Sequence, residues 1–138
     1  MYSGNERSAL IGKAGEDFVA QYLKSKGYII IKRNWRDSRY GEIDIVAENN
    51  ECIAFVEVKT RQKNALVSGL EAVDFGKQNR TKNASQTFMR KLRTNLPPRL
   101  DVAEVTVISE KDKEFELNDT FGRIAEQETI AMRRKRVF

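Results

Sequence analysis

Alternating apolar and polar residues predict two adjacent β-strands in the middle of the chain. In the run 53–59, β-branched and aromatic residues fill most positions, which is typical of a strand. The run 42–47 has the same character, and the residues 48–51 between the two runs are polar and favour a turn. We therefore expect a β-hairpin, in which a two-residue turn would pair Glu48 with Glu51.

Charged residues interrupt the apolar pattern of both expected strands. Residues i and i+2 of a strand share a face, so Glu57 and Lys59 should continue the face of Phe55. Asp44 lies between two isoleucines, although Asp is depleted in strands. The expected turn places Asp44 opposite Phe55 and one diagonal step from Glu57, at roughly 7–8 Å between Cα atoms. A slip of one residue would move Asp44 to the other face.

Two carboxylates that converge in this way favour a metal-assisted reaction. Asp44 and Glu57 would offer oxygen ligands to a hard cation such as Mg²⁺ or Mn²⁺. Such an ion polarises a phosphodiester and lowers the pKa of a bound water, while Lys59 would orient that water or steady the developing charge. The alternative is a solvated strand face, because alternating charges of the Glu-x-Lys kind are common there.

Helical periodicity and turn residues predict the rest of the fold. Ser3 and Glu6 have the spacing of a capping box, and Gly27 is a typical helix stop. Gly12 and Gly15, inside that helix, each cost about 1 kcal/mol relative to Ala, so we expect another segment to approach the backbone there. The expected elements are a helix at 3–26, a strand at 28–33, a polar loop ending at 41, the hairpin, a helix at 74–94, and strands at 100–108 and 114–117.

Composition restricts the class of protein and of site. The chain has 138 residues, of which 40% are hydrophobic and 33% charged, as expected for one soluble domain with its own core. No apolar run is long enough to span a membrane and no signal-peptide pattern is present, so we expect a cytoplasmic protein. A single cysteine and no histidine exclude disulfides, cysteine-rich zinc sites and His-dependent catalysis, which leaves carboxylates, lysines and hydroxyls for any chemistry.

Positive charge is concentrated in one segment. The net charge is +5 and the isoelectric point is near 9.4, yet no acidic residue lies between Asp74 and Asp101. This pattern favours binding of a polyanion, although a solvated helix face is the alternative. The seven basic residues of this segment are Lys77, Arg80, Lys82, Arg90, Lys91, Arg93 and Arg99.

A set of short motifs is spread over about residues 9–121: Gly15-Glu16, Gly27-Tyr28, Arg33-Asn34 with Arg36, Gly41 to Asp44, Phe55 to Arg61, Ala72-Val73, Lys77, Asp101-Val102, and Asn118 with Phe121. Together these motifs resemble the YraN-like family of uncharacterised bacterial proteins. That family looks like a branch of the PD-(D/E)xK restriction-endonuclease-like superfamily, close to archaeal Holliday-junction resolvases. Two features depart from the family pattern: Asp74-Phe75, where the family commonly has Thr-Pro, and the residues from 122 onward.

The resemblance implies a set of site residues. Asp44, Glu57 and the Val58 carbonyl would hold the metal, Lys59 would position the water, and Glu16 would assist the metal or its water shell. Three residues would support the site: Glu42, Lys77 and Gln78. The residues expected to contact nucleic acid are Arg36, Arg61, Lys77, Arg80, Lys82, Arg90, Lys91 and Arg93.

The implied protein is an α/β domain at 1–121 with a restriction-endonuclease-like core, a mixed sheet of about five strands flanked by helices. Residues 122–138 would be a basic extension, either a short helix or disordered. We expect hydrolysis of phosphodiester bonds in DNA, including branched DNA, with Mg²⁺ or Mn²⁺. The alternatives are a nucleic-acid-binding accessory protein on the same fold and a structural partner in a larger assembly. The expected partner is nucleic acid, DNA ahead of RNA, without a membrane, and a homodimer is left open.

Overall fold

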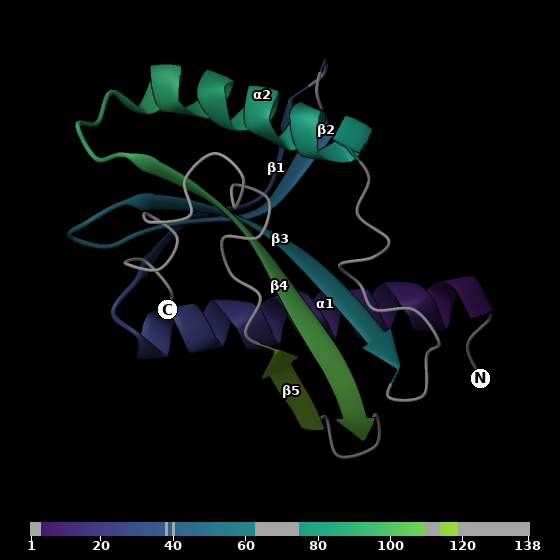
Figure 1. The fold of residues 1–138 in the computed structure, drawn as a ribbon. Coiled ribbons are helices and arrows are strands. Elements are labelled where there is room, and N and C mark those ends of the chain that lie inside the picture. Colours follow the sequence, from purple (N-terminus) through teal and green to yellow (C-terminus); the bar gives the residue numbers. More distant parts are fainter. Residues whose placement is uncertain (1–3, 38, 40, 63–74, 110–113, 119–138) are drawn as a thin grey trace.

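A twisted mixed sheet with one helix on each side forms the part of the chain that the computed structural model describes, residues 4–37, 39, 41–62, 75–109 and 114–118 (Figure 1). No helix among these residues is long and apolar enough to cross a membrane. The predicted extension from residue 122 onward lies outside this range. The elements are α1 (Gly4–Ser25), β1 (Ile29–Asp37), β2 (Gly41–Glu48), β3 (Ile53–Gln62), α2 (Phe75–Leu92), β4 (Pro98–Ser109) and β5 (Glu114–Asn118).

The strands follow the order β1-β2-β3-β4-β5 across the sheet. Only the β3–β4 pair is parallel, and the other neighbouring pairs are antiparallel. The parallel pair requires a crossover, and the crossover from β3 to β4 contains α2 (Figure 1). The prediction of a mixed α/β fold with a mixed sheet and flanking helices is therefore confirmed.

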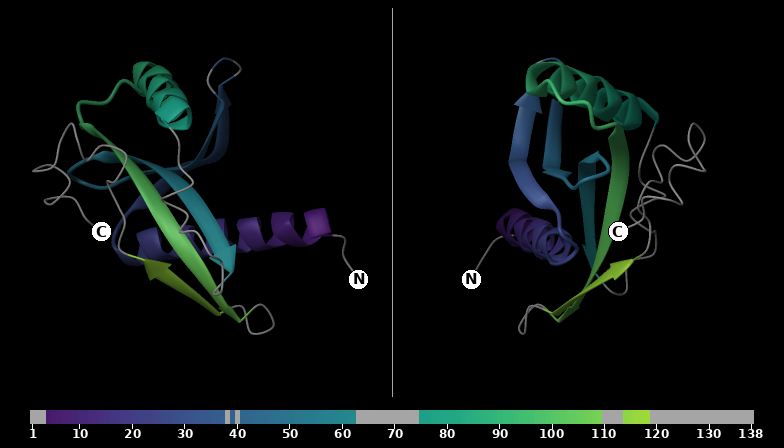
Figure 2. Two further views of the ribbon diagram at one scale, coloured as in Figure 1. Left: turned by 45° about the vertical axis from the view of Figure 1, so that its right-hand side comes forward. Right: turned by 90° about the vertical axis from the view of Figure 1, so that its left-hand side faces the viewer.

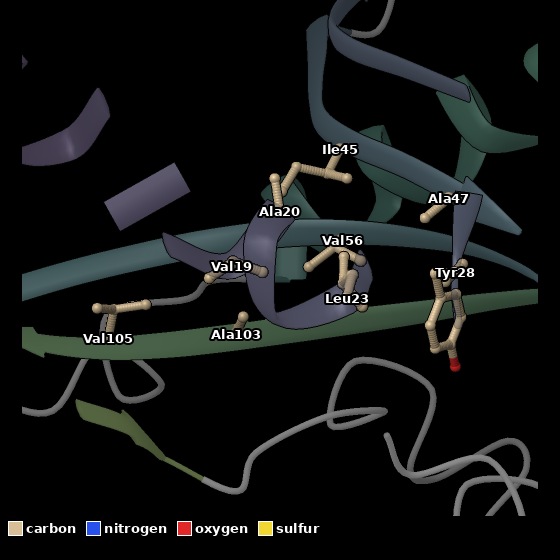
Figure 3. Close-up of a cluster of buried hydrophobic side chains, with 10 residues drawn as sticks. Val19, Ala20, Leu23, Tyr28, Ile45, Ala47, Val56, Ala103 and Val105 are labelled. Atoms are coloured by element: carbon tan, nitrogen blue, oxygen red, sulfur yellow. The ribbon is translucent and has the colours of Figure 1, made fainter. Parts of the chain in front are cut away.

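Each helix covers a separate apolar core on its own side of the sheet (Figure 2). Val19 and Leu23 of α1 are fully buried against strand residues that include Ile45 and Val56 (Figure 3). On the other side, Phe88 of α2 packs edge-on against Phe55, with ring centroids 5.7 Å apart. β3 therefore alternates, with its even-numbered residues toward α1 and its odd-numbered residues toward the α2 side.

The approach of α1 to the sheet depends on a glycine. A Cβ atom placed on Gly15 would overlap Thr60 Oγ1 and lie 3.0 Å from Thr60 Cβ, so no side chain fits there without moving the helix. This confirms the close approach expected at Gly15. At Gly12 the expectation is wrong among the described residues, because no atom lies within 4 Å of the corresponding position.

The β2–β3 hairpin is longer than predicted at its turn. Glu48 pairs with Ile53, so the predicted pairing of Glu48 with Glu51 is wrong, and so is the placement of Asp44 opposite Phe55. The reason is a side-chain turn, in which Asn49 Oδ1 accepts hydrogen bonds from the amides of Glu51 at 2.8 Å and of residue 52 at 2.9 Å. The register differs from the predicted one by two residues. If this register continued one residue past its last pair, Ile45 with Val56, Asp44 would lie opposite Glu57.

The β1–β2 hairpin is irregular at two points, a register shift between Ile30 and Lys32 and a change of pleat at Asn34. Asn34 has a left-handed backbone, with φ of 52°, which is uncommon outside glycine and is best tolerated by Asn and Asp. Arg33 pairs with Ile45, which packs in the α1-side core, whereas Trp35 pairs with Ile43, which packs in the α2-side core. Asp44 lies between the two isoleucines, which in a regular strand would share a face. Because Ile43 and Ile45 instead face opposite sides of the sheet, the side chain of Asp44 belongs to neither face.

A buried ion pair fixes the start of β4 against the segment that follows α1. The Arg99 guanidinium contacts the Asp101 carboxylate at 2.7 Å and donates to the Tyr28 hydroxyl at 3.0 Å. Both ionic side chains are almost fully buried, and a buried pair of this kind is stable only when it is well paired. Burial raises the pKa of Tyr28 to about 12, so its hydroxyl stays protonated at neutral pH. Arg99 is therefore not part of the expected basic surface.

We expect Gly15→Ala to lower the free energy of unfolding by about 1–3 kcal/mol, because the added methyl group overlaps Thr60 and forces α1 away from β3. Gly12→Ala is the matched control on the same helix. It should raise the same free energy by up to about 1 kcal/mol through helix propensity alone. Urea unfolding of both variants makes the comparison, and Thr60→Ala should recover part of the Gly15→Ala loss. Equal effects of the two alanines would contradict the close contact.

Candidate functional site

A buried acid and a lysine lie side by side in the second half of β3. Lys59 Nζ is 3.2 Å from Glu57 Oε1, as expected for two residues on one face of a strand. The Glu57 side chain is only 6% exposed and that of Lys59 is 24% exposed. An isolated carboxylate is costly to bury, so the ammonium of Lys59 offsets part of the cost of burying Glu57.

The Asp44 side chain contacts the backbone of the same strand, β3. The last backbone pair between β2 and β3 is Ile45 with Val56. Beyond it, the Val58 amide donates to Asp44 Oδ2 at 2.8 Å instead of to a backbone carbonyl. Because the pleat changes at Asp44, its carboxylate is directed across to β3 and occupies the position where the ladder would have continued. One carboxylate oxygen is engaged in this way, and the aspartate lies next to the Glu57 segment.

Glu16, the acid expected from α1, lies in a second cluster. The Asn34 amide is between two carboxylates: in the orientation that satisfies both, its nitrogen donates to Glu42 Oε1 at 2.9 Å and to Glu16 Oε1 at 3.0 Å. Arg33 Nη2 is 3.7 Å from Glu16 Oε1. Burial raises the pKa of Glu16, the Arg33 charge opposes that rise and the Glu42 charge adds to it. The residues that Glu16 contacts are therefore Arg33 and Asn34 of β1.

Further polar residues share the face of the Glu57–Lys59 pair. Arg61 is next on that face of β3, and its Nη1 is buried without a hydrogen-bond partner among the described residues. Glu104 of β4 pairs with Lys59 in the parallel ladder and is 7% exposed. Glu104 was not predicted as a site residue from the sequence. It nevertheless shows the same signal as Asp44, an acid between apolar residues in a buried strand, here between Ala103 and Val105.

Helix α2 carries basic residues on the side of the sheet that holds the Glu57–Lys59 pair, because Phe88 of α2 contacts Phe55 of the same β3 face. Arg80 and Arg90 are exposed, and Lys91 Nζ lies 5.7 Å from the centre of the Trp35 ring. Arg93 is exposed just beyond the end of the helix.

The other residues predicted to contact nucleic acid or to support the site lie on β1 and α2. Arg36 is mostly exposed and donates to Glu42 Oε2 at 3.0 Å. Lys82 is half-buried on α2. The backbone of Lys77 and Gln78 belongs to the first turns of α2, but their side chains lie outside the described residues. Their roles stay predictions.

The described acids offer carboxylate oxygens at two places. Asp44 is bonded to the amide of Val58, the residue that follows Glu57, and Glu16 and Glu42 share the Asn34 amide. Across the part of the chain that the structure describes, no group of three or more His, Cys, Asp or Glu side chains is arranged to hold a metal ion. A divalent metal such as Mg²⁺ is ordinarily held by one or two carboxylates together with waters and substrate phosphates.

Comparison with known proteins gives one consistent result. The model of the family described as "Uncharacterised protein family UPF0102" matches residues 15–105. A UPF0102 protein from Alkaliphilus metalliredigens is 43% identical over 115 residues, which cover 83% of this chain and 99% of that protein. One from Alkaliphilus oremlandii is 42% identical over 116 residues, covering 80% and 97%. One from Dictyoglomus turgidum is 44% identical over 80 residues, covering 58% and 67%.

We expect Asp44→Ala to lower the free energy of unfolding by about 1–3 kcal/mol, because it leaves the Val58 amide without its acceptor. Asp44→Asn keeps an oxygen in the same place and should lose less. Glu51→Ala, in the exposed turn of the same hairpin, is the control for losing a carboxylate and should change stability by less than either. Chemical denaturation at neutral pH measures all three. If Asp44→Ala were as stable as Glu51→Ala, the hydrogen bond would have no structural importance.

Proposed function

We propose that this chain, which belongs to the uncharacterised protein family UPF0102, is a metal-dependent nuclease that hydrolyses phosphodiester bonds in DNA. The observation that carries the proposal is the burial of Glu57 beside Lys59, next to the point where Asp44 replaces the β2–β3 backbone ladder. The proposal includes a restriction-endonuclease-like core for the sheet and its two helices.

The main rival for Glu57 and Lys59 is a solvated ladder of surface charges. Such a ladder has both side chains in water and contributes little to stability. Glu57 instead has 5% of its surface exposed, and its strand is paired on both sides. A buried charged pair at the end of an apolar strand face is costly to form. This cost supports a functional reason for the pair.

The acids suit a hard divalent cation by their chemistry. Asp44 and Glu57 would hold Mg²⁺ or Mn²⁺ together with the Val58 carbonyl, since carboxylate and carbonyl oxygens are the ligands these ions prefer. The bound ion would polarise the phosphodiester and lower the pKa of a water molecule. The Asp44–Val58 hydrogen bond orients the Asp44 carboxylate and holds it against β3.

The other residues have roles that follow from their charge. Lys59 would orient the attacking water and stabilise negative charge that develops on the phosphate. Glu16, whose pKa is raised by burial, would accept or donate hydrogen bonds at the edge of the metal's water shell. Arg61, whose buried Nη1 has no hydrogen-bond partner in the part of the chain that the structure describes, would hold a phosphate oxygen next to the one that reacts.

The basic residues of α2 would bring the nucleic acid to the acids. Carboxylates repel a polyanion, so cations nearby are needed for binding. Arg80, Arg90 and Lys91 lie on the helix that covers the Glu57 side of the sheet. This basic surface also supports the second candidate, a protein that binds nucleic acid without cleaving it, because binding requires only the cations.

We expect the wild-type protein with Mn²⁺ or Mg²⁺ to cleave at least one of four DNA substrates: linear duplex, single strand, flap and four-way junction. Asp44→Asn and Glu57→Gln should abolish cleavage, because each removes a charge from the metal ligands. Gel electrophoresis of labelled DNA measures the products, and circular dichroism verifies the fold of each variant.

Glu51→Gln is the matched control, since it also removes one acidic charge from the same hairpin. It should cleave like the wild type. Cleavage that survives in both Asp44→Asn and Glu57→Gln would assign the activity to a contaminant or to another site. DNA binding without cleavage under all these conditions would favour the accessory role.

Binding should depend strongly on salt. Each phosphate contact contributes roughly −0.9 to the slope of log affinity against log salt concentration on duplex DNA. Arg80→Glu combined with Arg90→Glu should therefore flatten the slope by about two and weaken binding similarly for all sequences. Fluorescence anisotropy over a salt series measures both quantities.

Lys24→Glu combined with Lys26→Glu is the control, because it makes the same change in net charge at exposed positions at the end of α1. Its slope should match that of the wild type. Equal slopes for all three proteins would assign the α2 cations to solubility.

A further inference from the structure

A cavity of about 570 Å³ lies between α1 and β1. This volume is within the roughly 300–1,000 Å³ that is usual for small-molecule sites. Four of its residues have the spacing of one helix face, and the other two come from β1. The six lining residues are Ala9, Gly12, Lys13, Glu16, Arg33 and Asn34.

Gly12 is unexplained by packing within the described residues. A glycine inside a helix costs about 1 kcal/mol relative to Ala, and Gly15, one turn later, has a structural reason in its contact with Thr60. A Cβ on Gly12 would meet no atom within 4 Å. Its missing side chain instead leaves room in the cavity and lets a ligand approach the helix backbone.

The β1 wall of the cavity has two unusual features. Arg33 Nε is buried and has no hydrogen-bond partner among the described residues, although a buried donor is normally paired. Asn34 is held in a left-handed backbone conformation, with φ of 52°, and such conformations concentrate at ligand-binding positions. Arg33 and Asn34 therefore form a fixed wall of the cavity, in which Arg33 Nε itself is covered by neighbouring atoms.

We propose that this cavity binds one nucleotide unit of a nucleic-acid strand, with its phosphate at the Lys13 ammonium and the Arg33 side chain, which both line the cavity, and its sugar and base against Gly12. The inference rests on the proposed function, because the ligand class follows from nucleic acid as substrate. Glu16 and the Asn34 amide supply polar groups that hydrogen-bond to the sugar or base. Through these two residues the cavity adjoins the Glu16–Asn34–Glu42 cluster.

The acid at the rim does not prevent phosphate binding. Asp17 contacts Arg33 Nη1 at 2.8 Å and Lys13 Nζ at 3.3 Å, and its side chain is about half exposed. Exposed ion pairs contribute little free energy, so a phosphate can replace Asp17 at Lys13. The Arg33 guanidinium has five N–H donors, so Asp17 can keep its contact with Nη1 while a phosphate accepts from another.

Filling the cavity tests the proposal. Gly12→Leu should weaken binding of a labelled single-stranded oligonucleotide by about tenfold or more, because overpacking a site typically costs 1–3 kcal/mol and 1.4 kcal/mol is tenfold. Gly12→Ala should weaken it less. Both variants should melt at or above the wild-type temperature, since the added atoms meet open space. Binding is measured in EDTA, so that no cleavage occurs, with thermal unfolding recorded for each protein.

Gln21→Leu is the matched control, because it adds the same apolar side chain at an exposed position of α1 on the opposite side of the helix. It should bind as the wild type does. Arg33→Lys keeps the charge but removes the guanidinium donors, and it should weaken binding of the oligonucleotide and of a mononucleotide such as thymidine monophosphate alike. Competition by inorganic phosphate as strong as competition by the mononucleotide would reduce the cavity to an anion site and overturn the nucleotide assignment.

The outcomes separate this inference from the proposed function. Unchanged affinity in Gly12→Leu, with cleavage intact in the wild type, would overturn the cavity site and leave the nuclease proposal standing. Weakened binding in Gly12→Leu without any metal-dependent cleavage would support the cavity site and contradict the nuclease. A wild-type protein that binds no oligonucleotide would overturn both.

Discussion

The arrangement of the candidate site depends on one hydrogen bond, from the Val58 amide to the Asp44 carboxylate. It forms where the β2–β3 ladder ends, and it exists because the pleat of β2 changes at Asp44, between Ile45 on the α1 side and Ile43 on the α2 side. A buried amide must be paired, so the strand can leave its neighbour here only if a side chain takes over the acceptor role. An aspartate can do so because its carboxylate accepts hydrogen bonds as a backbone carbonyl does.

The elements around this hydrogen bond are held by contacts that permit little adjustment. Gly15 lets α1 contact β3 at Thr60, so a shift of the helix would act directly on the strand that carries Glu57 and Lys59. On the neighbouring strand, Arg99 of β4 is fixed by Asp101 and Tyr28. Burial of Tyr28 keeps its hydroxyl protonated over the physiological range, so this constraint does not change with pH there. Sites on such rigid elements hold their geometry more closely than sites on loops.

The elements and their order were predictable from periodicity, but two local features were not. The predicted register of β2 on β3 was wrong by two residues because the Asn49 side chain caps the turn. A shift of two residues nevertheless preserves which residues of β2 and β3 lie on the same face. The left-handed Asn34 could not be foreseen, since a period of two places Arg33 and Trp35 on one face. Glu104 was hidden for another reason: its proximity to Lys59 depends on a parallel pairing between distant strands.

The placement of a neutral donor between Glu16 and Glu42 has an electrostatic consequence. A lysine or arginine in place of Asn34 would pair with both acids and cancel their charge, whereas an amide satisfies one oxygen of each and leaves the charge in place. The other nearby cations, Arg33 and Arg36, are already shared with these acids and with Asp17. Two like charges around one amide repel each other, and Glu42 contributes to the raised pKa of Glu16 for this reason. Glu42 is two residues before Asp44 in β2, and the positive charge of the proposed metal ion would lower this repulsion.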